Sequence, residues 1–471
     1  MSLPRRYMFA ALVLCGLLTS CSFEAYLAKP LRPEQSAQEY TARTLDDAAL
    51  RHYLRSNGVA GEPWPPSRWR LSELTLVAFY FHPDLAVARE RVAVARASLH
   101  KATERAPLEV AVLAEHHNER TPQDDGPWSL GFELELPMAG ASRREAIVEG
   151  ERAALERAEL EVGAVAWQVR ARLRAALVEL YSARGQAALA GKEHEHNEVL
   201  VRLLQRRLQE GAVSSGEVTA ARLRSHQARA DAQSHALAAT RAWGDLAAAL
   251  ALPLEVTRRM GVDFSDWNEF PPAPDGGKAR AQALLNRLDI RAGLLDYAIA
   301  ESHVRLEVAR QYPALRWSPG FLWDQGDAVW SLGLGLIMPA TVGNRRSMQL
   351  AQAQREFAAR RFEQSQQAVM AQTATTVALY DQALQGLRVV EAQKALSQQH
   401  LKETEGLFAG GYADRVRLTQ GQLESVGAAR AAWQARRAAL DAWGELENVL
   451  QAPWVNLASP IATNPSMRSR P

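Results

Sequence analysis

The feature that most constrains this 471-residue chain is that it contains one unit twice. Short segments recur in the same order, and each recurs about two hundred residues later. The matching pairs are Pro107 with Pro313, Trp128-Ser129-Leu130-Gly131 with Trp330-Ser331-Leu332-Gly333, Pro137 with Pro339, Arg143-Arg144 with Arg345-Arg346, Leu180-Tyr181 with Leu379-Tyr380, and Ala242-Trp243-Gly244-Asp245-Leu246 with Ala442-Trp443-Gly444-Glu445-Leu446. The offset is 202 for the strand-like Trp pair (330−128) and 199 for the Leu-Tyr pair (379−180). Because chance matches would not stay in order, the sequence predicts two copies of one unit.

Each unit contains a long stretch without proline. No proline lies between Pro137 and Pro253, and none lies between Pro339 and Pro453. Good helix formers such as Ala, Leu, Glu, Gln and Arg fill both stretches, which indicates long uninterrupted helices. From Leu155 onwards, apolar residues recur at spacings of three and four, so one face of the first helix is apolar.

Each proline-free stretch is interrupted once, by Gly211 in the first unit and by Gly410-Gly411 in the second. Three residues after Gly211 and Gly411 come the helix-capping residues Ser214 and Asp414. Glycine after a helix and a capping residue before the next are typical of a tight helical turn. Each unit is therefore predicted to end in a hairpin of two long helices. The first of these, 142–208, would be roughly 100 Å long.

A different pattern precedes each helical hairpin. Over residues 128–137, Trp, Leu and Phe alternate with Ser, Gly and Glu, and residues 330–339 repeat this pattern less cleanly. Alternation with a period of two is typical of a β-strand. Partner strands are expected at 108–115 and 315–323, so each unit reads as helix, β-hairpin, long helix, long helix.

The predicted strands have one apolar face, and the carboxylates of Glu133 and Glu135 lie on the other. An apolar outer face with a polar inner face is the pattern of a membrane barrel strand, so Glu133 and Glu135 are predicted to face a lumen. Four strands cannot close a barrel, and open edges are not tolerated in lipid. The chain must then oligomerise: two copies would supply eight strands and three would supply twelve. Only a barrel of more than eight strands leaves a bore.

The N-terminus has the pattern of an export signal. Arg5 and Arg6 precede an apolar run that is too short to span a membrane as a helix, and Leu18-Thr19-Ser20-Cys21 follows. This tetrapeptide resembles the lipobox of bacterial lipoproteins, which implies cleavage before Cys21 and acylation of its thiol. Ser22 then favours sorting to the outer membrane. The alternative is an ordinary signal peptide with an incidental cysteine.

Composition excludes several classes of function. Lys and Arg number 55 against 53 for Asp and Glu, so nothing favours nucleic acid as a partner. The only cysteines are Cys15 and Cys21, which leaves no disulfide scaffold or cysteine-based zinc site. The histidines of His116-His117 diverge if they end a strand, and those of His194-Glu195-His196 do not share a helical face, so no metal site is predicted. No P-loop, HExxH or GxSxG motif is present, so no enzyme activity and no cofactor are expected.

The predicted organisation of the chain has six parts. They are a lipoprotein signal peptide at 1–20, an N-terminal segment at 21–81, a first repeat at 82–255 with its β-hairpin at 108–137, a linker at 256–278, a second repeat at 279–455 with its β-hairpin at 315–339, and a tail at 456–471.

This ordered set of residues carries a resemblance. It includes His82-Pro83-Asp84-Leu85 with a weaker echo at 287–290, the paired prolines and arginines above, and the turns at Gly211 and Gly411. The whole mature chain resembles the outer membrane efflux protein family typified by TolC, and more loosely its lipidated heavy-metal-exporting (Czc-type) branch. The resemblance implies a fold that is mainly α with a β-barrel part. It also implies a homotrimer with a twelve-stranded outer-membrane barrel and a helical periplasmic tunnel.

The resemblance further implies partners at the helical turns, namely a periplasmic adaptor with an inner-membrane pump or a type I secretion ATPase. Gly211, Ser214, Glu217, Gly411 and Asp414 are therefore predicted to form the tip that docks the adaptor. The resemblance suggests acidic residues such as Glu217 in a constriction there. The alternative is that Glu217 and Ser214 form a capping box, which has the same spacing. Arg417 stands at the matching position of the second unit and puts an acidic ring in doubt.

The predicted function is a passive exit duct for efflux or secretion in the bacterial outer membrane. The alternative is a structural envelope lipoprotein with coiled-coil helices and no conduction. The predicted strands distinguish between these two hypotheses, because a purely structural lipoprotein does not need hairpins whose outer faces are apolar enough to contact lipid.

Overall fold

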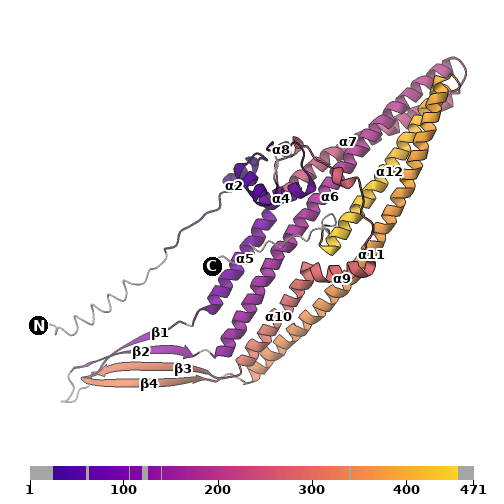
Figure 1. The fold of residues 1–471 in the computed structure, drawn as a ribbon. Coiled ribbons are helices and arrows are strands. Elements are labelled where there is room, and N and C mark those ends of the chain that lie inside the picture. Colours follow the sequence, from indigo (N-terminus) through magenta and orange to yellow (C-terminus); the bar gives the residue numbers. More distant parts are fainter. Residues whose placement is uncertain are drawn as a thin grey trace. The chain divides into compact units, whose positions relative to one another are not determined.

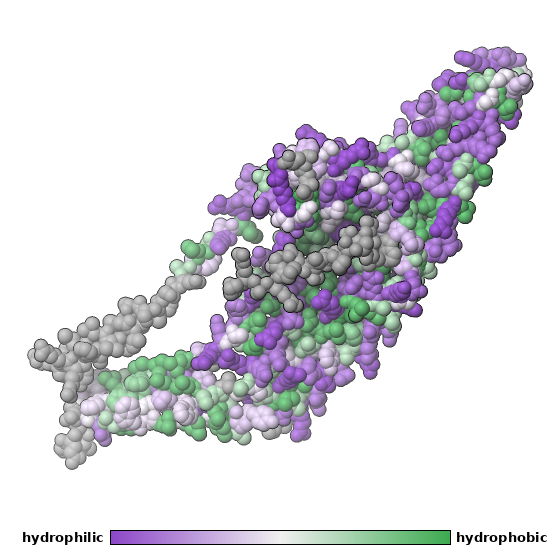
Figure 2. All heavy atoms as spheres, in the orientation of Figure 1, coloured by the Kyte–Doolittle hydropathy of each residue, from purple (hydrophilic) through white to green (hydrophobic). Residues whose placement is uncertain are grey.

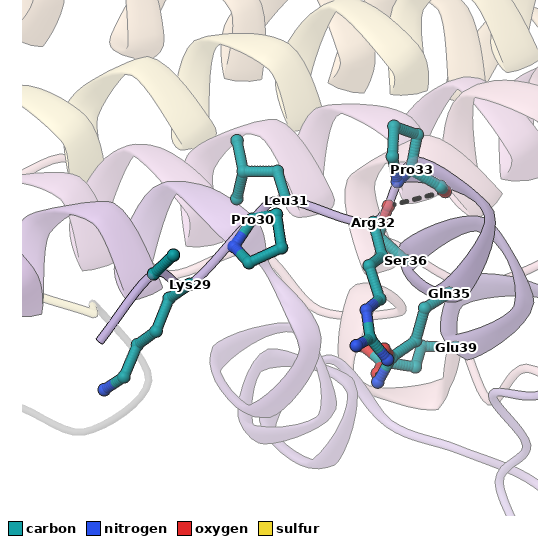
Figure 3. Close-up of a pocket in the computed structure, with 9 residues that line it drawn as sticks. Lys29, Pro30, Leu31, Arg32, Pro33, Gln35, Ser36 and Glu39 are labelled. Carbon is teal, nitrogen blue, oxygen red and sulfur yellow. Dashed lines mark hydrogen bonds between the residues drawn. The ribbon is translucent and has the colours of Figure 1, made fainter.

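The computed structural model describes residues 25–59, 63–105, 107–118, 126–138, 140–338 and 341–453. The predicted signal peptide, Cys21 and the predicted tail lie outside these residues. The chain divides into a first unit, Met1–Arg43, and a second, Thr44–Pro471. The described residues of the first unit are exposed except for the half-buried Arg43, and they include one helix, α2 (Pro33–Thr41). A pocket lies along residues 28–39, where the Ser36 hydroxyl donates to the Pro33 carbonyl oxygen at 2.9 Å (Figure 3). All its lining residues come from this one segment.

The second unit contains the duplicated part of the chain (Figure 1). Its described elements are, in chain order, α3 (Ala48–Ser56), α4 (Leu71–Phe81), α5 (Pro83–Thr103), β1 (Glu109–His116), β2 (Trp128–Met138), α6 (Ala141–Gln209), α7 (Ser215–Leu250), α8 (Leu254–Arg258), the 3-10 turn η1 (Ser265–Trp267), α9 (Gly276–Asn286), α10 (Leu288–Ala309), β3 (Ala314–Asp324), β4 (Asp327–Ile337), α11 (Thr341–Ala409) and α12 (Arg415–Leu450). The order α5-β1-β2-α6-α7 is repeated as α10-β3-β4-α11-α12. The predicted fold class, mainly α with a β-barrel part, is confirmed.

The long helices of the two repeats match in length. Helices α6 and α11 have 69 residues each, and α7 and α12 have 36 each. At 1.5 Å per residue, a 69-residue helix is about 100 Å long. The absence of proline lets each helix run unbroken from the strands to its turn.

The helices of the two repeats correspond at an offset of 200, since α6 begins at Ala141 and α11 at Thr341. Burial follows the same offset: Leu180 and Tyr380 are both fully buried, as are Leu173 and Thr373. The Leu-Tyr pairs, which match in sequence at an offset of 199, therefore do not occupy equivalent places in the two helices. The residue that occupies the place of Leu180 in the second repeat is the tyrosine of its pair rather than the leucine.

The four strands form one antiparallel sheet in the order β1-β2-β3-β4, so the hairpins of the two repeats lie side by side. Glycines on the polar face allow the strands to approach closely. A Cβ atom added to Gly131 would lie 2.6 Å from the carbonyl oxygen of Phe321. The hairpins predicted at 108–137 and 315–339 are present, with strands that differ by a few residues from the predicted ones.

The main hydrophobic core lies where the long helices meet the short ones. Leucines on α3, α4, α6, α7 and α12 are fully buried there. The segment predicted as a linker, 256–278, takes part in this core, since Met260 and Trp267 are buried. Its Pro271 carbonyl oxygen accepts a hydrogen bond of 2.7 Å from the hydroxyl of Tyr380. This segment therefore packs against the helices instead of only joining the repeats.

Helices α6 and α12 meet across a seam that contains a buried ion pair. The Arg174 guanidinium lies 3.4 Å from the Glu447 carboxylate, and the exposed fractions of the two side chains are 5% and 2%. Arg174 also donates to the Leu440 carbonyl oxygen at 2.9 Å and lies over the ring of Trp443. Burial lowers the pKa of Arg174, and the charge of Glu447 opposes this effect. Gly444 makes room for the guanidinium, which a Cβ atom there would overlap.

Candidate functional site

The four-stranded sheet has two chemically different faces. One face carries large apolar side chains from all four strands, most of them exposed. They include Val110, Val112, Leu130, Phe132, Leu136, Trp317, Trp323, Trp330, Leu332, Leu334 and Leu336. Figure 2 shows hydrophobic side chains gathered over the strands, whereas hydrophilic ones dominate at the far tip of the helices. In water, such a contiguous apolar face would be strongly unfavourable, so it marks a surface that contacts lipid or protein.

The apolar face has the height of a membrane's hydrocarbon layer. Trp128 and Leu136, eight residues apart on β2, are separated by about 26 Å along the strand. A strand tilt of roughly 40° reduces this to about 20 Å along the membrane normal, near the roughly 25 Å band of outer-membrane barrels. Trp128, Trp323 and Trp330 lie toward the hairpin loops and Trp317 lies toward the helices. Tryptophan at both borders is typical of membrane interfaces.

The opposite face of the sheet carries the charged residues of the strands and many small ones, together with a few apolar residues such as Leu113, Leu322 and Val329. Glu133 lies opposite Ala111 on β1 and Gly320 on β3, and Glu135 lies opposite Glu109. Among the described residues of the strands, this face carries one positively charged side chain, Arg316, and six carboxylates, which are Glu109, Glu115, Glu133, Glu135, Asp324 and Asp327. The net charge of this face is thus about five negative charges per chain.

Arg316 distinguishes the two glutamates that the sequence singled out. Its guanidinium donates to the Glu135 carboxylate at 3.1 Å, across the boundary between the repeats. In the described part of the chain Glu133 forms no ion pair, and small residues face it on both sides. Sequence reasoning missed Arg316, because a strand-to-strand partner 181 residues away leaves no local pattern.

The two adjacent histidines near the hairpin loop have separate surroundings. His116 packs edge-on against Trp128, with ring centroids 4.7 Å apart, on the apolar face. His117 contacts the hydroxyl of Ser129 at 3.0 Å, and Ser129 donates to the Asp324 carboxylate at 2.5 Å on the polar face. The structure thus places the two rings on different sides. Within the described ranges, no group of three His, Cys, Asp or Glu side chains is arranged to hold a metal ion.

At the other end of the long helices, α6 and α7 are joined by a turn of defined shape. Gly211 has a φ of +75°, in the left-handed region that glycine adopts without steric cost. Ser214 and Glu217 form a capping box, in which the Ser214 backbone N–H donates to the Glu217 carboxylate at 2.8 Å. The Glu217 backbone N–H donates to the Ser214 hydroxyl at 3.3 Å. The capping-box alternative for Glu217 is therefore present in the structure, and its carboxylate is engaged locally.

The turn between α11 and α12 has the same backbone and a different cap. Gly411 has a φ of +79°, and the Asp414 carboxylate accepts a hydrogen bond of 2.8 Å from the Arg417 backbone N–H. This bond and an ion pair with Arg207 on α6 lower the pKa of Asp414. Arg207 thereby links the two tips to each other. Sequence reasoning named Asp414 as a cap and missed Arg207.

Among the described residues, no helix has both the length and the apolar composition needed to cross a membrane.

The sheet has one apolar face suited to lipid and one acidic face, and helical hairpins about 100 Å long continue from it. This combination is typical of a class of outer-membrane channels. The family model for the outer membrane efflux protein matches residues 81–252 and 279–451. The chain belongs to the outer membrane efflux protein family, and its function is that of an outer-membrane exit duct.

Solved structures share the fold. The outer-membrane channel OprN is 18% identical with a TM-score of 0.68, and the match covers 92% of this chain and 100% of that one. VceC from Vibrio cholerae is 17% identical with a TM-score of 0.66, covering 83% and 99%. CusC is 15% identical with a TM-score of 0.65, covering 92% and 100%. No curated protein matches the chain.

Proposed function

We propose that three copies of the chain assemble into the exit duct of a tripartite efflux or type I secretion system. The observation that carries this proposal is the four-stranded sheet, which has one apolar face suited to lipid and, among the described strands, two unpaired edges, β1 and β4. Backbone groups at an open edge cannot be satisfied in lipid, so the edges must pair with those of other copies. Three copies supply twelve strands, which leave a bore that eight strands would not.

The acidic face of the sheet lines this bore, with Glu133 and Glu135 toward the lumen. Five net negative charges per chain become about fifteen in the trimer, in a narrow space walled by a medium of low dielectric constant. Such a lining attracts cations and repels anions. The duct performs no chemistry, and the energy for export comes from the pump.

The mature N-terminus carries lipid on Cys21, which anchors the chain in the outer membrane beside the barrel. The support is the pattern Leu18-Thr19-Ser20-Cys21. Mass spectrometry of the mature N-terminal peptide should show acyl groups on this residue. An unmodified α-amino group on any other residue would refute the anchor and leave the duct unaffected.

The tips of the helical hairpins dock the periplasmic adaptor of an inner-membrane pump. The support is the defined backbone of both turns, with Gly211 and Gly411 in the left-handed region and caps at Ser214 and Asp414. A turn of fixed shape at an exposed end presents the same surface in every copy. Cross-linking of single cysteines at Ser215 and Arg415 to a co-expressed adaptor would test this docking.

The decisive experiment is conductance of the purified protein in a planar bilayer, together with its mass by native mass spectrometry. A trimer that conducts cations in preference to anions is expected. A trimer without conductance would support the alternative of a structural envelope lipoprotein.

Three variants test, in the same conductance assay, how much each charge that faces the lumen contributes to ion selectivity. Glu133→Gln and Glu135→Gln should both lower the cation preference, because each removes one negative charge from the face, and Glu135→Gln also leaves Arg316 without its carboxylate partner. Arg316→Gln should raise the cation preference. Equal selectivity in all three variants would mean that this face does not line the bore. Ser318→Ala, on β3, serves as the uncharged control.

A further inference from the structure

All four strands meet their helices at the same end of the sheet (Figure 1). Helices α5 and α10 end just before β1 and β3, and helices α6 and α11 begin just after β2 and β4. Along this layer α5 packs against α6, α6 against α10, and α10 against α11. The four junctions between strand and helix therefore form one band, which borders the apolar face of the sheet.

These junctions are strongly basic. Within nine residues of a strand end on this side, the chain has eight Lys and Arg residues and three Glu residues, which leaves a net charge of five positive charges. Each of the four junctions contributes two of the basic residues. They are Lys101 and Arg105, Arg143 and Arg144, Arg305 and Arg310, and Arg345 and Arg346.

Three of the eight basic residues are engaged within the chain. Arg143 donates to the carbonyl oxygen of Ala309, at the end of α10, at 3.2 Å. Arg310 and Arg305 form ion pairs with glutamates of the helices, at 2.6 and 2.8 Å. The other five are exposed and form no ion pair with a described residue, and we call them the basic collar. They are Lys101, Arg105, Arg144, Arg345 and Arg346.

The acidic face of the sheet does not neutralise the basic collar. Glu109 and Glu135 are its carboxylates nearest this end, and they lie opposite each other. Glu135 pairs with Arg316, and Glu109 forms no ion pair within the described residues although Arg105 lies only four positions before it. The collar side chains are therefore not turned toward these carboxylates. The remaining glutamates of the junctions form no ion pair with the collar either, and they are Glu104 and Glu145.

The height of the basic collar matches that of a layer of lipid headgroups. At this end the apolar face finishes with Met138, Leu315 and Leu336, which are all exposed. Arg144 lies three residues into α6 and Arg346 lies five residues into α11, about 5 and 8 Å beyond the first residues of their helices. The headgroup region on each side of a bilayer is about 5–8 Å thick. The collar thus begins where the hydrocarbon layer would end.

We propose that the basic collar binds the phosphate groups of anionic phospholipids in the membrane leaflet that faces the periplasm. The proposal rests on the proposed membrane position of the sheet and goes beyond it, because a duct needs no particular lipid. Long basic side chains lay their stems along apolar surface and place their charges among the headgroups. A guanidinium group can bind two phosphate oxygens at once. Three copies would place fifteen such side chains around the barrel, and they would gather anionic lipid there.

Native mass spectrometry of the purified full-length protein tests this binding. The protein is held in micelles doped with equal amounts of phosphatidylglycerol and phosphatidylcholine, and the lipids retained by each trimer are counted. The wild type is expected to retain phosphatidylglycerol in preference, and less so at high salt, which screens exposed charges. The triple variant Arg144→Gln, Arg345→Gln and Arg346→Gln should lower the ratio of the two lipids by about tenfold or more, because each basic residue near an anionic surface contributes about fivefold in affinity.

A matched control removes the same charge elsewhere. Arg222, Arg224 and Arg229 are exposed on the half of α7 nearer the tip and form no ion pair with a described residue. Their replacement by Gln (Arg222→Gln, Arg224→Gln, Arg229→Gln) should leave the lipid ratio at the wild-type value. An equal loss in the control and in the collar variant would show that net charge alone selects the lipid, and the proposed site would be wrong.

Conductance distinguishes a lipid site from a lining of the bore. In a planar bilayer of phosphatidylcholine alone, the collar variant should have the cation preference of the wild type. A higher cation preference would place these arginines in the lumen and overturn the proposal. If the wild type conducts as a trimer but retains both lipids equally, the collar binds no anionic lipid and the proposed function stands. If the wild type neither assembles nor conducts, the proposed function fails and the lipid site fails with it.

A variant that keeps the charge covers the case in which the glutamine variant does not assemble. Arg144→Lys, Arg345→Lys and Arg346→Lys together preserve three positive charges in the same headgroup layer. This variant should form trimers and should still retain phosphatidylglycerol in preference to phosphatidylcholine. A lysine trimer of normal mass without that preference would show that the collar's charge does not hold the lipid.

Discussion

A charge placed on the apolar face of the sheet should prevent assembly in the membrane. Leu134 lies on this face of β2, opposite Val110 of β1, one residue beyond the middle of the strand Trp128–Met138. An arginine near the bilayer midplane of a barrel costs about 2–4 kcal/mol. Three copies would incur about 6–12 kcal/mol per barrel. This equals a large part of the roughly 5–15 kcal/mol that stabilises a typical domain. Leu134→Arg should therefore abolish the trimer in the outer membrane.

Three control variants separate the effect of the face from that of the residue. Glu133→Arg introduces the same side chain one position earlier, on the acidic face, where water solvates it, and the variant should assemble. Leu130→Arg keeps the apolar face but lies nearer the strand end, where the cost falls to about 0–1 kcal/mol. Glu133→Gln should assemble as the wild type does.

The assay is the fraction of heat-modifiable trimer in outer-membrane extracts, followed by urea titration of the folded barrel in lipid vesicles. The expected order of trimer yield is wild type and Glu133→Gln, then Glu133→Arg and Leu130→Arg, with Leu134→Arg last. If Leu134→Arg and Glu133→Arg assemble equally well, the two faces have the same environment and the strand does not face lipid. If only the residue mattered, all three arginine variants would fail together.

Three further changes concern the helices and their tips. The pKa of Asp414 is lowered in the folded tip, first by the hydrogen bond from the Arg417 backbone N–H and then by Arg207. Its contribution to stability is therefore present at neutral pH and is lost as the pH falls through that folded pKa, below about 3.9. Asp414→Asn should flatten this acid dependence in hydrogen-exchange measurements of the tip, and an unchanged acid dependence would contradict the role assigned to the Asp414 carboxylate. Glu447→Gln should cost about 3–5 kcal/mol in thermal unfolding, because it leaves the buried Arg174 without its carboxylate. Gly411 has a φ of +79°, so Gly411→Val should strain the turn by roughly 1–3 kcal/mol. The variant should still form trimers, but its export and its cross-linking to the adaptor should decrease. Normal export would show that the tip is not part of the docking surface.

The elements that could be predicted from sequence are those fixed by local rules. Absence of proline and the spacing of apolar residues predicted the first long helix at 142–208, and the structure has it at Ala141–Gln209. Alternation predicted the strand at 128–137, and the turn residues Gly211 and Gly411 lie where the helices reverse. Each of these signals is contained within a short window of the chain, so no knowledge of distant contacts was needed.

What could not be predicted depends on partners far apart in the chain. Arg316 meets Glu135, and Arg207 meets Asp414, across 181 and 207 residues. The shared Leu-Tyr pair is a local coincidence, because it matches at an offset of 199 whereas burial in the helices follows 200. The segment 256–278 looked like a linker from its prolines and glycines, whereas Trp267 within it is buried in the core. A high content of proline and glycine therefore does not show that a segment is a flexible linker, because a single large aromatic residue such as Trp267 can anchor it in the core.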